Sequence, residues 1–304
     1  MRYLFCLFMS FALYSCAQDD SETPFQNTAD EVFSFEVDSI NLDMIAAPDG
    51  NSLYVTYSAD NGLNENLTRF NLQSGSQTTV VHPDLSEGRK LVILGDYVYS
   101  VGNVMYRASL DLAQVEVFGP GIGSIGANSP VSDGTNIFYV FGYESWATFD
   151  LTTGEPDLQN DNWNLWRTGS ASCFRQEKIY LFGGHSGNAN DGFEIFDSIF
   201  IYDTNDNSWS QNTLPFAAFE TFSASYGGQI LLAGNKFSDG SGAFIGIYDT
   251  QSATFVDTPI SLDLQNISIR SIAAIGDDFY VAYVELENIG DATMTVKVVK
   301  LQLP

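Results

Sequence analysis

A polar segment with two tryptophans and an arginine, residues 159–169 (QNDNWNLWRTG), carries side chains well suited to binding a ligand. The flat rings of Trp163 and Trp166 can stack on a sugar ring, while the neighbouring asparagine amides and Arg167 hydrogen-bond its hydroxyls. Two apolar rings close together also form a patch typical of binding surfaces. These residues predict a glycan site. The alternative is that one or both rings fill a gap between neighbouring structural units.

A second polar segment, residues 185–197, supplies further candidates for the ligand site. His185, Asn188 and Asp191 offer an imidazole, an amide and a carboxylate in one of the longest predicted loops, and loops on a rigid scaffold often carry binding residues. The oxygens here and in DTNDNS, residues 203–208, suit a cation but lack the spacing of a calcium loop. Asn and Asp also favour turns, so we expect a hairpin turn at DTNDNS and predict no metal and no cofactor.

Residues that could support catalysis are few. Cys173 has only two histidines in the chain as possible bases, and its small, apolar neighbours predict a buried thiol rather than a nucleophile. The sequence has no zinc spacing, phosphate loop or nucleophile elbow. An acid and a base near a central pocket would have to come from other charges, for which the candidates are Arg175, Glu177 and Arg270. The sequence therefore favours a binding role over an enzymatic one.

The first 16 residues, MRYLFCLFMSFALYSC, combine one basic residue with an apolar run that is too short to span a bilayer. This pattern predicts a secretory signal peptide at residues 1–15. Its end, LYSC, resembles the lipobox of bacterial lipoproteins. The resemblance implies that Cys16 becomes the first mature residue and carries lipid, which binds the protein to a membrane. The alternative is ordinary secretion with cleavage near Ala17.

Residues 16–28 are polar and acidic, and they predict a flexible tether between the lipid and a folded domain at residues 29–304. The acidic pair Asp19-Asp20, soon after Cys16, is similar to the surface-export signals of lipoproteins in the Bacteroidota group. This similarity implies an outer-membrane lipoprotein that faces the cell surface or the periplasm.

The chain is strongly acidic, with 38 acidic and 12 basic residues and a formal net charge of −26. Such a polyanion repels nucleic acids, so we exclude DNA and RNA as partners. Hydrophobic residues make up 44% of the sequence and aromatic residues 14%. This content suffices for a packed core, so the acidity belongs to a solvated surface rather than to a disordered chain.

The elements that must position these residues are β-strands in a repeating arrangement. Short apolar strand patterns recur about every 45 residues, and a further strand follows in each copy. Six such units, each with room for four strands, fit the blades of a propeller. The aligned strands are LYV at 53–55, YVY at 97–99, FYV at 138–140, YLF at 180–182, ILL at 230–232 and FYV at 279–281.

The fourth copy carries the most specific motif. Gly183 and Gly184 end its apolar strand, Tyr202 lies in the next strand, and Trp209 follows seven residues later. This set resembles the kelch motif, in which the glycine pair ends the second strand and the Tyr and Trp pack between blades. The resemblance, which is weaker in the other copies, implies an all-β fold, a six-bladed kelch-like β-propeller.

The two ends of the predicted ring complement each other. Residues 32–37, VFSFEV, alternate like a strand but belong to no complete copy, and the sixth copy ends at MTVKVVKLQLP without a final strand. An open ring would leave a sheet edge unpaired. We therefore predict that the N-terminal strand becomes the outer strand of the last blade and closes the ring.

Together these features favour a lipid-anchored binding module of the bacterial envelope. Its ligand, a glycan or a protein partner, would be engaged on the loop face of the propeller. Two alternatives remain. Some six-bladed kelch-like periplasmic proteins are sugar epimerases or mutarotases, and a structural subunit of a surface complex would bind through the sides of its blades.

Overall fold

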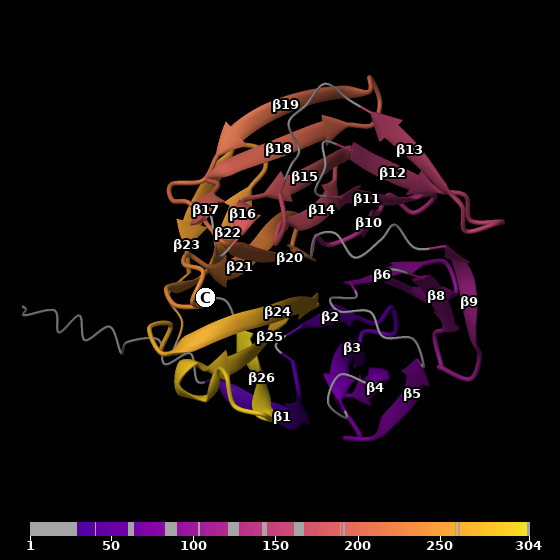
Figure 1. Ribbon diagram of the computed structural model, residues 1–304, viewed down its shortest axis with the longest axis vertical. Helices are drawn as coiled ribbons and strands as arrows, with labels where there is room; N and C mark the ends of the chain where they lie inside the picture. The colour runs from indigo at the N-terminus through magenta and orange to yellow at the C-terminus, as the bar shows by residue number, and fades with distance from the viewer. Residues whose placement is uncertain are drawn as a thin grey trace, which may run out of the picture.

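The computed structural model describes residues 29–39, 41–59, 64–82, 90–102, 104–120, 128–141, 145–160, 167–188, 190, 192–258, 260 and 262–302. Within these ranges six four-stranded antiparallel sheets are arranged as blades around an axis (Figure 1). The helical content of this part of the chain is one short 3-10 turn, Leu286–Asn288. No helix among the described residues is long and apolar enough to cross a membrane. The predicted all-β, six-bladed propeller is confirmed.

The first three blades follow one pattern, in which four consecutive strands pair antiparallel. Blade 1 consists of β2 (Leu42–Ala46), β3 (Ser52–Ala59), β4 (Asn64–Asn71) and β5 (Gln77–His82). Blade 2 consists of β6 (Lys90–Leu94), β7 (Tyr97–Val101), β8 (Val104–Ser109) and β9 (Val115–Pro120). Blade 3 consists of β10 (Val131–Ser132), β11 (Ile137–Phe141), β12 (Ser145–Phe149) and β13 (Pro156–Asn160).

Blade 4 adds a small hairpin to this pattern, whereas blade 5 has the same four consecutive strands as the first three blades. Blade 4 consists of β14 (Ala171–Arg175), β15 (Lys178–Phe182), β18 (Ser198–Asp203) and β19 (Ser208–Thr213). Its added hairpin consists of β16 (His185–Asn188) and β17 (Gly192–Ile195). Blade 5 consists of β20 (Glu220–Tyr226), β21 (Gln229–Asn235), β22 (Ala243–Asp249) and β23 (Thr254–Asp257).

Blade 6 joins the two ends of the described chain. It contains β24 (Ile267–Ile275), β25 (Asp278–Glu285) and β26 (Met294–Gln302), and β1 (Asp30–Val37) is its fourth strand. β1 runs antiparallel to β26 along its whole length. This pairing confirms that the N-terminal strand closes the ring.

Packing between blades explains why the middle strands are so apolar. Each blade covers the faces of its two neighbours, so a strand such as β25 is buried on both sides, and its burial is continuous rather than alternating. The hydrophobic clusters accordingly combine residues of adjacent blades. Between blades 6 and 1, for example, the rings of Phe33 and Phe70 stack with centroids 4.1 Å apart. The core is therefore divided among the interfaces between neighbouring blades.

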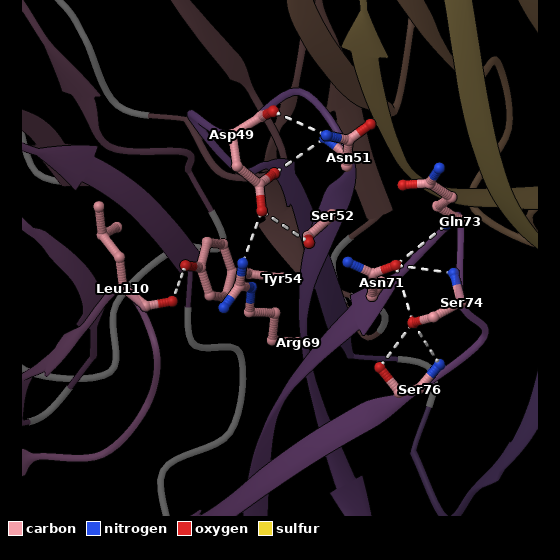
Figure 2. A network of polar contacts seen from close by, with 10 residues as sticks. All are labelled: Asp49, Asn51, Ser52, Tyr54, Arg69, Asn71, Gln73, Ser74, Ser76 and Leu110. Atoms are coloured by element: carbon pink, nitrogen blue, oxygen red, sulfur yellow. Dashed lines mark hydrogen bonds and ion pairs between the residues drawn. The ribbon is translucent and has the colours of Figure 1, made fainter.

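Polar side chains fix the hairpin turns at the rim, as in the β2–β3 turn of blade 1 (Figure 2). Asp49 accepts a hydrogen bond from the Asn51 amide at 2.8 Å and pairs with Arg69 at 2.6 Å. Partial burial by itself would raise the pKa of Asp49, but the hydrogen bonds from Asn51 and Arg69 outweigh it and lower the pKa. The Tyr54 hydroxyl donates to the Leu110 carbonyl, which joins blade 1 to blade 2.

Candidate functional site

Several of the predicted site residues fall where the structure gives no account of them. Trp163, Trp166 and Asp191 lie outside the described residues, as does Cys16 with the predicted signal peptide and tether. The glycan site predicted at Trp163 and Trp166 therefore stays a prediction.

Arg167, a predicted ligand residue, is almost fully buried among groups of blade 4. Only 2% of its surface is exposed, and its guanidinium donates to the Gly183 carbonyl at 2.9 Å and the Ser198 hydroxyl at 3.0 Å. The guanidinium carbon also lies 4.2 Å from the centre of the Phe200 ring. Burial lowers the pKa of Arg167 to about 10. The side chain ties the segment before β14 into blade 4, and a ligand role for Arg167 stays a prediction that this burial does not favour.

His185 is held by protein groups on both sides of its ring. It begins β16, where the sequence predicted a loop, and its ring stacks on Phe219 with centroids 3.9 Å apart. Its Nδ1 lies 3.2 Å from the Phe219 carbonyl and its Nε2 lies 3.0 Å from the Thr168 hydroxyl. Burial lowers the pKa of the imidazole. His185 thus fastens the β16–β17 hairpin to blade 5, and Asn188 pairs with Gly192 within that hairpin.

The four residues of the kelch-like motif serve the packing of blade 4. Gly183 and Gly184 have positive φ angles of 53° and 88°, and a Cβ on Gly184 would lie 2.6 Å from the Thr168 carbonyl oxygen. Side chains rarely adopt such angles, so glycine is required there. The rings of Tyr202 and Trp209 lie 4.9 Å apart, in a cluster shared by blades 3 and 4.

The charges considered for catalysis do not meet in one place. Arg175 and Glu177 lie at the β14–β15 turn, where the inner strand of blade 4 ends. Arg270 lies near the start of β24 and pairs with Glu220, its Nη1 3.2 Å from the carboxylate. Burial lowers the pKa of Arg270, which the charge of Glu220 partly offsets. Because these groups sit at opposite ends of the inner strands, they do not form the shared acid–base pocket that an enzyme would need.

Among the described residues, sequence reasoning missed a polar cluster on the axis of the ring. A cavity of about 60 Å³ is lined by residues from all six blades, including Asp43, Phe222 and Ser271. The Asp43 carboxylate accepts hydrogen bonds from the Leu91 amide at 2.8 Å and the Ser271 hydroxyl at 3.0 Å, and lies 4.0 Å from the Lys90 ammonium. A space of this size suits a few water molecules but is too small for a sugar.

A much larger cleft, of about 530 Å³, opens between blades 3 and 4. Its inner wall is formed by the buried aromatic side chains Phe138, Trp146 and Tyr202. The other lining residues are all polar and come from two turns and two strands: Asp133, Asn136, Thr148, Gln159, Thr204 and Asn207. At the inner wall of the cleft, the rings of Trp146 and Tyr202 meet across the interface with centroids 4.9 Å apart.

The sequence contained a partial signal for this cleft. DTNDNS does form the β18–β19 turn, with the Asn205 amide donating to Asp203 at 3.0 Å. A similar turn at residues 133–136 joins β10 to β11. The sequence of each segment is typical of an ordinary hairpin turn. Neither sequence by itself indicates that the two turns border one cleft.

Comparison with known protein families agrees with this geometry. Residues 166–214, which contain the whole of blade 4, match the Kelch motif. A search of curated proteins found no match to the chain. The motif and the six-bladed ring together make this a kelch-like propeller, a fold that commonly serves as a binding or scaffold module.

Proposed function

We propose that this protein is a lipid-anchored binding module of the bacterial envelope and that its ligand is a glycan. One observation carries the proposal: the propeller has a cleft of about 530 Å³ between blades 3 and 4, whereas its axial cavity measures only about 60 Å³. Small-molecule sites range from roughly 300 to 1,000 Å³. The cleft therefore has the size of a ligand site, and the axial cavity does not.

This contrast weighs against the enzymatic alternative. An epimerase or mutarotase would need an acid and a base facing one pocket that admits a sugar. Asp43 lines an axial cavity that is too small for a sugar. Its carboxylate lies 4.0 Å from the Lys90 ammonium and accepts a hydrogen bond from the Leu91 amide.

The exposed apolar side chains weigh against the alternative of a structural subunit. Such a subunit would present a broad apolar patch, because stable interfaces bury contiguous surface. The large exposed hydrophobic residues of the described chain are instead distributed over several blades, mostly on outer strands. They are Val81, Val115, Val117, Leu158, Phe237 and Val256.

The lipid anchor is the part of the proposal that rests on the sequence alone. Cys16→Ala should move the protein from the membrane fraction to the soluble fraction, because the lipidated cysteine supplies the membrane affinity. The measurements are membrane fractionation and the mass of the mature N-terminus. Membrane retention of the variant, or a wild-type N-terminus without acyl mass, would count against the anchor.

A glycan array probed with residues 29–304 tests the ligand class. We expect retention on a subset of glycans, with binding that is saturable in solution. Wild-type protein that is folded by circular dichroism yet binds no glycan would overturn the proposed glycan binding.

A further inference from the structure

We propose that the cleft between blades 3 and 4 is the ligand site and that it binds a neutral saccharide of one or two rings. The inference rests on the proposed binding function and adds the place of binding and the class of ligand to it. Blades 3 and 4 are neighbours in the ring (Figure 1), so the site is assembled from two consecutive units of the chain.

The chemistry of the lining matches a polyhydroxylated ligand. Asn136, Gln159 and Asn207 contribute amides, and Thr148 and Thr204 contribute hydroxyls. Amides and hydroxyls both donate and accept hydrogen bonds, as the hydroxyls of a sugar do. Behind them, the aromatic inner wall offers the edge of an apolar surface to the C–H groups of a sugar ring.

Several lining groups are held in place before any ligand arrives. The Tyr202 hydroxyl donates to the Asn207 Oδ1 at 2.8 Å, which directs the oxygen of that amide toward Tyr202 and leaves its NH₂ group as the donor for a ligand. Asp133 Oδ1 accepts from the Thr135 and Asn136 amides at 2.7 and 2.6 Å, which fixes the β10–β11 turn. A site that is ordered in advance loses less entropy when it binds.

The charge of the cleft indicates which saccharides it excludes. Asp133 is the one ionisable acidic side chain among the lining residues, and none of them is Lys or Arg. The whole chain also carries a formal net charge of −26. A uronic acid or a sugar phosphate would meet like charge without a cationic partner. The cleft therefore selects neutral saccharides over acidic ones.

The test combines a defined panel of probes with paired variants. The probes are cellobiose, maltose, lactose and N,N′-diacetylchitobiose as neutral disaccharides, with a digalacturonate as the acidic one, each titrated calorimetrically into residues 29–304. Glycans retained on the array join the panel. The cleft variants are Asn136→Ala and Gln159→Ala, singly and together. The matched control is Gln77→Ala, since Gln77 is exposed on β5, the strand of blade 1 that corresponds to β13.

We expect at least one neutral saccharide to bind, the double variant to lose affinity tenfold or more, and the Gln77→Ala variant to bind like the wild type. Loss of affinity counts only where the melting temperature of the variant stays near that of the wild type. Thr148→Ala provides an independent cleft variant on β12 if the turn variant is unstable.

The possible outcomes distinguish failure of the proposed site from failure of the proposed function. If array glycans bind the double cleft variant as well as the wild type, the cleft is not the site, although the binding function stands. If the wild type binds no glycan, both proposals fall. If digalacturonate binds more tightly than every neutral disaccharide, the proposed ligand class is wrong.

Discussion

Replacement of Asp43 by alanine should destabilise the whole ring, because this carboxylate joins three blades. It lies on β2 of blade 1 and accepts hydrogen bonds from the Leu91 amide of blade 2 and the Ser271 hydroxyl of blade 6. The neighbouring Lys90 side chain is only 8% exposed, with its Nζ 4.0 Å from the Asp43 carboxylate. The substitution leaves a buried amide without an acceptor and a buried ammonium without its carboxylate.

The expected loss in the free energy of unfolding follows from these two defects. A buried amide without a partner costs about 1 to 3 kcal/mol, and removing one member of a buried ion pair costs about 3 to 5 kcal/mol. The effects overlap at one site, so we expect about 3 to 5 kcal/mol in total. This is a large share of the stability of about 5 to 15 kcal/mol that is typical of folded proteins.

Urea unfolding of residues 29–304, followed by tryptophan fluorescence, measures this loss. Asp43→Asn keeps an acceptor for Leu91 and should lose less, while Lys90→Met in the Asp43→Ala background should recover part of the loss. Asp291→Ala, at an exposed turn, is the matched control and should stay within about 0.5 kcal/mol of the wild type. If Asp43→Ala also stays within that margin, the carboxylate does not hold the axis together.

Three further predictions concern other parts of the ring. Deletion of residues 30–37 should unfold or oligomerise the domain, because it exposes β26; a monomer with unchanged melting, by light scattering and calorimetry, would contradict ring closure. Trp209→Ala should lower the free energy of unfolding in urea by about 2 kcal/mol. Its ring is half-buried, so the loss should be smaller than the loss of about 3 to 5 kcal/mol for a fully buried tryptophan. An effect below about 0.5 kcal/mol would disprove its packing role. Burial lowers the pKa of His185 in the folded state, so below about pH 6.5 the unfolded state binds more protons and the stability of the fold should fall. His185→Gln should reduce this pH dependence of the melting temperature. An unaltered profile would refute the lowered pKa of His185.

The blades were predictable from sequence because their signal is local and repeated. Apolar strands with polar turns recur along the chain, and most copies fold into a sheet of consecutive strands. The closing strand was predictable by elimination, because β1 had no blade of its own and blade 6 lacked an outer strand. The β16–β17 hairpin was missed, since its sequence is rich in Gly, Asn and Asp, which indicate loops more than strands.

The candidate site was harder to predict because it depends on contacts between blades. Arg167 lies in a polar segment, so its sequence neighbours suggested exposure, yet carbonyls of blade 4 and the Phe200 ring surround it. Likewise, Asp133 and Asn207 each look like turn residues, and only the arrangement of two blades brings them to one cleft. The repeat order places blades 3 and 4 side by side, but it does not indicate that a cleft opens between them.

The pairing of β1 with β26 also sets the order of assembly. A ribosome makes β1 first and β26 last, so the earliest strand must wait for nearly the whole domain before it finds its partner. Contacts that are this distant in sequence form slowly, and both strands present unpaired edges in the meantime. Blades 1 to 5 can form as hairpins emerge, whereas closure is the final step. A nascent chain arrested before residue 294 should therefore be the species most prone to aggregate and most dependent on a chaperone.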